Sequence, residues 1–278
     1  MLLLFVVSLL WALSFGIIKR WLPGVDSAFV ATARLGLSLL VFIPFLRLRG
    51  IGWRHAAALI AIGAVQFGLM YLAYLASFPY LGAYEVALFT ITTPILVTFF
   101  ADLLDGCLRP PALLAALLAV IGAGFIVARS TDFRLTLAGF GLVQLSNAAF
   151  ALGQVLYRRV RVRASGQRDR DVFGLLYLGG FAVALAVLLI RDVTVVLGTP
   201  QLLALVYLGV IASGLGFFLW NVGATRVNTG ALAVMNNAKI PLAVACSLLL
   251  FGEHTSLPRL LAGGAVMAAA AWLAQRRP

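Results

Sequence analysis

The chain has 278 residues, of which 63% are hydrophobic and only 11% are charged, and its mean hydropathy is +1.07. A soluble domain of this length needs a shell of charged residues, and this chain has too few of them to form one. The composition therefore excludes a soluble domain and predicts an integral membrane protein. The net charge is +12, but the basic residues lie at the ends of apolar runs, where loop charge sets topology, so no nucleic-acid partner is expected.

Apolar runs long enough to cross a bilayer recur along the whole chain, separated by short, polar or Pro/Gly-bearing connections. Ten transmembrane helices are predicted, at residues 1–21, 27–46, 55–77, 82–101, 111–128, 137–157, 172–190, 201–225, 230–251 and 257–274. The longest connection, 158–171, is polar. The predicted fold class is an all-α membrane protein made of two five-helix units, residues 1–135 and 136–278.

The basic residues are distributed unevenly between the two sides of this predicted bundle. The connections on the side of the N-terminus, together with the C-terminus, hold thirteen basic residues, and the opposite side holds six. Basic residues are enriched in cytoplasmic loops, so both termini are predicted in the cytoplasm.

A repeat is visible when the two halves are overlaid. Pro94 and Pro241 are 147 positions apart, and Asp105 and Glu253, which each close a helix before a short turn, are 148 apart. Because each half has an odd number of spans, the second half must be inverted relative to the first. Inverted repeats place their substrate site near the midplane of the membrane, so a central cavity between the halves is predicted.

A family resemblance is strongest over residues 201–253. The residues that carry it are Leu208 to Ala212, Leu219 to Asn221, Thr229 to Ala233, Pro241 and Gly252-Glu253, with Trp11, Gly16 and Lys19 in the first span. They resemble the EamA-type carriers of the drug/metabolite transporter superfamily, although Leu104-Asp105-Gly106 stands where a Gly-Glu pair is usual. The resemblance implies a ten-helix exporter in the bacterial inner membrane, with amino acids, other metabolites or drugs as possible substrates.

Lys239 lies within the ninth span, where an ammonium group needs a partner, a water-filled cavity or a substrate. It could bind a substrate carboxylate, form a structural ion pair or titrate during transport. Glu85 is the obvious internal partner, but helix geometry puts the two residues roughly 12 Å apart in depth. Glu85 is therefore predicted at the outer mouth of the cavity, and the missing partner favours an anionic group on the substrate.

Helical phase separates the polar neighbours of Lys239. At about 100° per residue, Asn236 shares a face with Lys239, whereas Asn237 points roughly 160° away. Asn236 is therefore predicted beside the cavity. Asn237 lies four residues before Pro241, so its carbonyl loses a hydrogen-bond donor.

Thr90 stands in the same relation to Pro94 in the first half. We interpret both prolines, with Thr90 and Asn237, as kinks that bend the fourth and ninth helices around the cavity. Ordinary tolerance of proline in membrane helices is the alternative.

An aromatic face is predicted on the third span. Tyr71 and Tyr74 share this face, and their hydroxyls need partners in hydrocarbon. The repeat overlay sets Tyr71 opposite Phe218 and Tyr74 opposite Asn221, which indicates a shared substrate-binding wall. Trp220 is adjacent but off the face, and is a weaker candidate. A helix-packing surface is the alternative interpretation.

Other polar residues within the spans are better explained as interhelical hydrogen-bond partners. They are Gln66, Gln144, Asn147 and Gln154. The sequence does not decide whether Arg34 is an interhelical hydrogen-bond partner or a ligand-binding residue. Small residues in the fifth and tenth spans suit close packing, as scaffold or as contacts of a possible homodimer. Membrane lipids are expected partners, and the spacing of Cys, His and Gly predicts no metal, disulfide, nucleotide site or other cofactor.

The predicted function is therefore a non-enzymatic secondary transporter that works by alternating access. It is expected to export a small carboxylate-bearing or zwitterionic metabolite, most simply an amino acid, bound by Lys239 and Asn236. One alternative is an exporter of lipophilic cations, which would need a carboxylate deep in the cavity. Another is a non-transporting membrane protein, such as a scramblase or a receptor.

Overall fold

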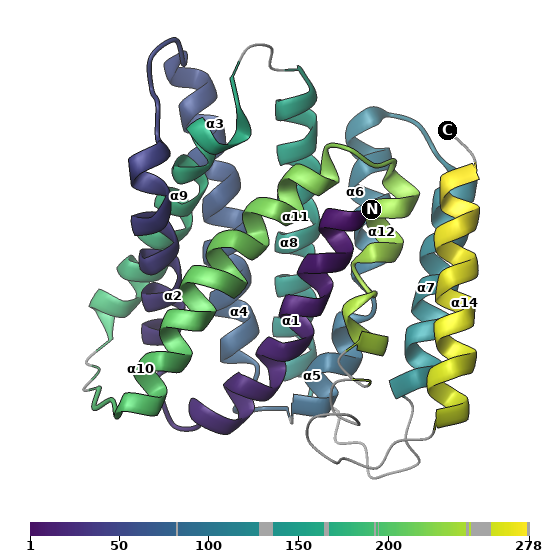
Figure 1. Cartoon of the computed structure of the whole chain (residues 1–278), viewed down its shortest axis with the longest axis horizontal. Helices are drawn as coiled ribbons and strands as arrows, with labels where there is room; N and C mark the ends of the chain where they lie inside the picture. Colours follow the sequence, from purple (N-terminus) through teal and green to yellow (C-terminus); the bar gives the residue numbers. More distant parts are fainter. Residues whose placement is uncertain are drawn as a thin grey trace.

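The computed structural model describes residues 1–81, 83–127, 136–163, 167–191, 193, 195–242, 245 and 257–276. Within these ranges the side chains of residues 15, 16, 19, 83–85, 87, 127, 163, 257, 275 and 276 are not described. The described part of the chain is helical and contains no strand (Figure 1).

The first half of the chain forms a series of α-helices. A 3-10 turn follows α2, and a π-helix lies between α3 and α4. These elements are α1 (Leu2–Trp21), α2 (Ser27–Phe42) with the 3-10 turn η1 (Ile43–Phe45), α3 (Trp53–Gly63), the π-helix η2 (Ala64–Leu69), α4 (Met70–Ala76), α5 (Ala83–Thr90), α6 (Thr93–Asp105) and α7 (Pro110–Val127).

The second half follows a similar order. Its elements are α8 (Leu137–Arg163), α9 (Asp169–Ile190), α10 (Thr199–Val206), the π-helix η3 (Tyr207–Leu215), α11 (Gly216–Ala224), α12 (Thr229–Met235) and α14 (Leu257–Arg276).

Six helical segments of the described chain are long and apolar enough to cross a membrane. They are Ser27–Phe45, Trp53–Ala76, Leu88–Asp105, Leu137–Val162, Asp169–Ile190 and Thr199–Ala224. Shorter apolar helices at Leu2–Ser14, Pro110–Ile126 and Pro258–Ala274 accompany them. The all-α, multi-pass membrane architecture predicted from the sequence is therefore present.

Local sequence signals explain where several helices begin and end. The carboxylate of Asp26 accepts hydrogen bonds from the backbone N–H groups of Ala28 and Phe29, which caps α2. Asn228 caps α12 in the same way. Gly106, with a φ of 64°, ends α6 in the left-handed region that only glycine adopts without strain.

The two halves share two irregular features at equivalent positions. The π-helix η2 separates α3 from α4, and η3 separates α10 from α11. The second feature is a pair of interruptions: α5 and α6 are separated by turn residues 91–92, and α12 is followed by turn residues 236–238. A π-helix holds more than 3.6 residues per turn, so it rotates every later side chain relative to an uninterrupted α-helix.

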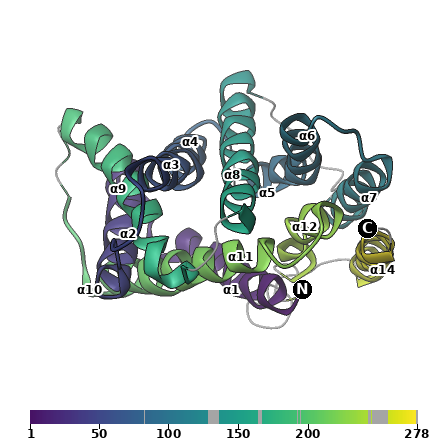
Figure 2. The ribbon, with the colours of Figure 1, turned by 90° about the horizontal axis from the view of Figure 1, so that it is seen from above.

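Helices from the two halves interleave. The long helix α8 lies between a group containing α2, α3, α4 and α9 and a group containing α6, α7, α12 and α14 (Figures 1 and 2). Across the halves, α1 packs against α11, α2 against α9, and α7 against α14. The contact between α3 and α9 is especially close, since a Cβ added to Gly179 would lie 1.9 Å from the carbonyl oxygen of Ile60.

Several segments that are distant in sequence share one end of the bundle. Both termini, the connection from α6 to α7 and the C-terminal end of α8 lie in the upper half of Figure 1. We call this end the termini side.

Candidate functional site

A cavity of about 100 Å³ lies between the two halves, beside the interruption of α5 and α6. It is called the central cavity below. Its lining residues are Trp11, Ser14, Ile18, Arg34, Met70, Tyr71, Tyr74, Thr90, Thr93, Ser146, Asn147, Phe150, Phe217 and Lys239. Two of them are cationic, and none of these described residues is acidic.

Arg34, on α2, is one of the two cations and is only 3% exposed. Its Nε donates to Ser213 Oγ at 3.1 Å, and its Cζ lies 4.4 Å from the centroid of the Tyr71 ring. The Tyr71 hydroxyl lies 2.9 Å from the same Ser213 oxygen. A cation–π contact favours a buried guanidinium but does not neutralise it. Among the described residues, no carboxylate lies within ion-pair distance of Arg34.

Lys239 supplies the second cation from the opposite half of the chain. It lies where helical structure resumes, at 239–242, after the turn residues 236–238. Its Nζ is 5.8 Å from the centroid of the Trp11 ring, and Trp11 is fixed by a 2.9 Å hydrogen bond from Nε1 to the carbonyl of Ala212. No carboxylate of the described chain forms an ion pair with Lys239.

The two helix interruptions meet beside the cavity. Asn237, in the second interruption, donates from Nδ2 to the carbonyl of Ile91 in the first, at 2.8 Å. The carbonyl of Phe89 accepts from Asn147 Nδ2 at 2.9 Å and from Gln144 Nε2 at 3.2 Å. Side-chain amides thus satisfy the carbonyls that the break in the helix leaves without a backbone donor.

Both prolines lie in the first turn after an interruption. Pro94 is at the start of α6, and the carbonyl of Thr90, four residues earlier, accepts instead from Thr93 Oγ1 at 2.7 Å. Pro241 lies in the helical turn 239–242, and the carbonyl of Asn237 accepts from the N–H of Ile240 at 3.0 Å. The helices are interrupted by turns at these places. A turn departs further from an α-helix than the kinks predicted from the sequence.

The family of this protein is identified by a match to a known family of sequences. The sequence model of the EamA-like transporter family matches residues 1–128 and 137–275. The chain belongs to the EamA-like transporter family. The predicted resemblance is confirmed, and so is the prediction of a transporter as opposed to an enzyme.

Three relatives that match this EamA-like transporter over nearly their whole length are all named biotin transporters. It is 43% identical to a "Probable biotin transporter" of Pseudomonas aeruginosa, over 96% of this chain and 94% of that protein. It is 40% identical to a "Biotin transporter" of Salmonella typhimurium and 39% identical to one of Escherichia coli K12, over 98% of this chain and 92% of each relative. A solved crystal structure that is 20% identical superposes with a TM-score of 0.82 over 98% of this chain and 96% of the other, which shows a shared fold.

Four residues singled out from the sequence line the central cavity of the EamA-like transporter. They are Tyr71, Tyr74, Thr90 and Lys239. Tyr71 and Tyr74, the two tyrosines of the aromatic face on the third span, therefore lie beside a cavity, whereas Phe67 of the same span is packed against Tyr177 and Phe217.

Four other predicted residues lie away from the cavity in hydrogen-bonded or packed positions. Asn236 exchanges hydrogen bonds of 3.2 and 3.3 Å with Gln154, and the Trp220 indole donates to Gln154 at 3.0 Å. Asn221 accepts from Gln66 at 3.1 Å. Phe218 packs against other rings, and the neighbouring Phe217 lines the cavity in its place.

The irregular helix geometry explains these differences from the prediction. The repeat overlay set Phe218 opposite Tyr71, but the π-helix before Phe218, η3, has nine residues whereas the one before Tyr71, η2, has six, so overlaid positions do not have to face the same way. The α-helical phase that paired Asn236 with Lys239 also fails, because α12 ends at Met235 and turns separate the two residues. The side chain of Glu85 lies outside the described residues, so its predicted position at the outer mouth stays a prediction.

Sequence reasoning undervalued Arg34, Asn147 and Phe150. Arg34 carried the strongest available signal, since an arginine within a membrane span is costly unless it has a partner or a substrate. Asn147 was predicted as a hydrogen-bond partner, which it is, and it also lines the cavity.

Proposed function

We propose that this EamA-like transporter is a secondary carrier of biotin, whose carboxylate binds between Arg34 and Lys239 in the central cavity. The observation that carries the proposal is the charge of the lining: two cations and, among the described residues, no acid. Arg34 and Lys239 have no carboxylate partner among the described residues, and cations without a partner are costly within a membrane, so an anionic ligand removes that cost on binding. The names of the relatives supply the identity of the anion.

The charge of the cavity also distinguishes between the substrate classes expected from the sequence. An amino acid would place its own ammonium group close to Arg34 and Lys239, where like charges repel. A lipophilic cation would meet the same repulsion without the benefit of a carboxylate. Biotin is an anion with no ammonium group, so the lining favours it over both.

The remaining lining suits the two fused rings of biotin. Trp11, Tyr71, Phe150 and Phe217 provide aromatic walls, and hydroxyls and amides are interspersed between them. Ligand pockets combine apolar walls with a few placed polar groups in this way. The cavity, at about 100 Å³, is smaller than the roughly 300 Å³ of the smallest typical ligand pockets, so substrate entry needs the surrounding helices to part. Alternating access provides that movement.

The arrangement we propose is ten transmembrane helices in two inverted repeats, residues 1–135 and 136–278. Paired π-helices, paired interruptions and the two matches of the family sequence model support it. The meeting of the interruptions at the cavity fits the design of inverted-repeat transporters, whose sites form at broken helices.

We also propose that the protein lies in the bacterial inner membrane with both termini in the cytoplasm. Cys107 is exposed on the connection between α6 and α7, on the termini side. A membrane-impermeant maleimide should therefore label Cys107 only in opened membrane vesicles or broken cells, with Cys107→Ser as the control. Labelling of Cys107 in intact spheroplasts would reverse the proposed topology.

Counterflow in proteoliposomes tests the substrate. Vesicles preloaded with unlabelled biotin should accumulate labelled biotin, with and without a pH gradient to detect proton coupling. Biotinamide has the same rings without the charge, and should compete at least about tenfold more weakly because it loses the charged contact. Amino acids and quaternary ammonium compounds should not compete. The absence of biotin counterflow, or equal competition by biotinamide, would contradict the proposal.

A further inference from the structure

A second, larger cavity opens on the termini side of the bundle. It has a volume of about 510 Å³ and is lined by the ends of α6, α7, α8, α12 and α14. We call it the inner vestibule. Its charged lining residues are Asp105, Arg109, Arg158 and Arg159.

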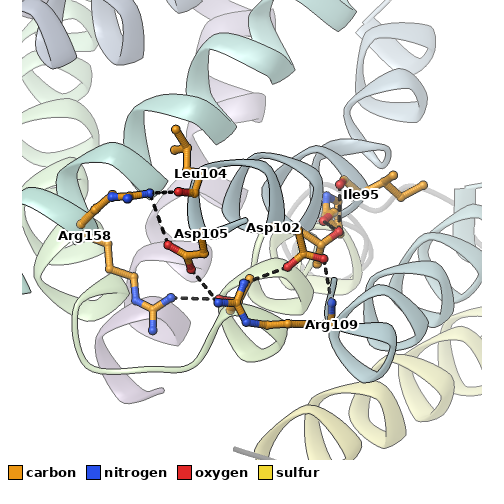
Figure 3. Close-up of polar contacts among 10 residues, drawn as sticks. Ile95, Asp102, Leu104, Asp105, Arg109 and Arg158 are labelled. Carbon is orange, nitrogen blue, oxygen red and sulfur yellow. Dashed lines mark hydrogen bonds and ion pairs between the residues drawn. The ribbon is translucent and has the colours of Figure 1, made fainter. Parts of the chain in front are cut away.

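The arginines of the inner vestibule differ in how their charges are compensated. Arg109 contacts Asp102 at 2.8 Å and Asp105 at 2.6 Å (Figure 3). Burial acts to lower the pKa of Arg109, but its hydrogen bonds to Asp105 and Asp102 outweigh burial and raise that pKa, so the group is firmly charged and paired. Arg159 bonds to the carbonyl of Leu104 and lies 3.4 Å from Asp105.

Arg158 differs from both, because Asp105 acts on it only through longer-range electrostatics. The half-buried guanidinium donates from Nη1 to Thr229 Oγ1 at 3.0 Å, and no described carboxylate lies within ion-pair distance of it. Because arginine presents five N–H donors, this one contact leaves it able to form a two-point interaction with an incoming carboxylate.

The helix that carries Arg158 connects the two cavities. Asn147 and Phe150 line the central cavity, Gln154 is one turn further, and Arg158 is one turn beyond Gln154. These four residues follow one face of α8, and Phe150 is about 12 Å from Arg158 along the helix axis.

A buried amide layer closes the path between the cavities. Gln154 bonds to Asn236 across the gap between α8 and the end of α12, and also accepts from Trp220. All three side chains are at most 1% exposed. On the α12 side, Asn236 again separates a vestibule residue, Gly230, from a central-cavity residue, Lys239.

We propose that Arg158 is a second binding site for the substrate carboxylate, which occupies it on the termini side after the Gln154–Asn236 contact has opened. The inference rests on the proposed anionic substrate of the central cavity. It adds a site that holds the same anion on one face of the membrane only. When the anion leaves Lys239 and Arg34, it meets another guanidinium that has no ion pair with a described carboxylate. The substrate carboxylate therefore does not lose all of its contacts with cations in one step.

Sided transport measurements test this site. In proteoliposomes of defined orientation, the half-saturation concentration of biotin is measured separately for each face. Arg158→Gln should raise it about tenfold on the termini side and leave the opposite side within about twofold, since one charged contact is lost on one face. Arg158→Lys keeps the charge and should lie between the variant and the wild type.

Arg168→Gln is the matched control, because Arg168 is an exposed arginine on the termini side outside the vestibule. Unchanged flux from the opposite face shows that Arg158→Gln is folded. If wild-type protein carries no biotin from either face, the proposed function fails. If it carries biotin but Arg158→Gln changes neither half-saturation value, or both equally, the second site is wrong. An Arg158→Gln effect that appears only with anionic lipids would also overturn it, in favour of a lipid headgroup site.

Discussion

The central cavity and the inner vestibule both contain buried or half-buried cations, and the clearest difference in charge compensation is between Arg109 of the vestibule and the two cations of the central cavity. In the vestibule, Arg109 is held between Asp102 and Asp105. In the central cavity, Arg34 and Lys239 have aromatic and hydroxyl contacts and no described carboxylate partner. A cation paired with carboxylates stabilises its surroundings, whereas an unpaired cation is retained at a cost in stability and is available to a ligand.

Whether a cation has a carboxylate partner should therefore predict whether its removal affects stability or transport. Removal of an unpaired buried charge should lower transport without lowering stability. Removal of a paired charge should do the reverse, because it leaves carboxylates without a partner. Arg158, which is half-buried and has no ion pair with a described carboxylate, is expected between these extremes.

The largest expected effect is at Lys239. Lys239→Met should reduce biotin counterflow by at least about 100-fold, because the carboxylate loses one of two charged contacts in a site shielded from water. The melting temperature of Lys239→Met in detergent should be unchanged or higher, since the substitution replaces a costly ammonium within a membrane span by an apolar side chain of similar length. Arg34→Gln should show a comparable loss of counterflow.

Lys239→Arg is the control for Lys239→Met, since it keeps the charge and should retain measurable counterflow. A fall in melting temperature of several degrees for Lys239→Met would identify a structural ion pair. Full counterflow by the same variant would remove Lys239 from the binding site.

The comparison also shows what the sequence could predict. Hydrophobic periodicity and length are enough to place helices, and the cost of an intramembrane charge is enough to single out Lys239. Tyr71 and Tyr74 were found because α4 keeps a regular phase up to the cavity. The repeat overlay indicated Phe218 where Phe217 lines the cavity, because no residue pattern reveals that η3 is longer than its counterpart η2.

The hydrogen-bond partner of a polar residue was harder to predict than the helix on which the residue lies. Asn236 and Lys239 are three residues apart, yet one is bonded to Gln154 and the other faces the cavity. The turns after α12 decide this, and they depend on tertiary contacts such as the bond from Asn237 to Ile91. A single sequence contains no record of that contact, whose two residues are 146 positions apart.

The smallest expected effect is at Arg109. Arg109→Gln leaves Asp102, whose side chain is 13% exposed, without its cation, and Asp105 with only the longer contact to Arg159. Because these ion pairs are partly exposed, the loss of stability should be only about 1 kcal/mol, seen as a fall of about 2 °C in the melting temperature. Counterflow at saturating biotin should change by less than about twofold. Arg168→Gln, which removes an exposed charge from the same side, should change neither quantity. If Arg109→Gln instead impaired transport as strongly as Lys239→Met while leaving stability intact, paired and unpaired cations would not differ in role, and the charge argument for the central cavity would lose its basis.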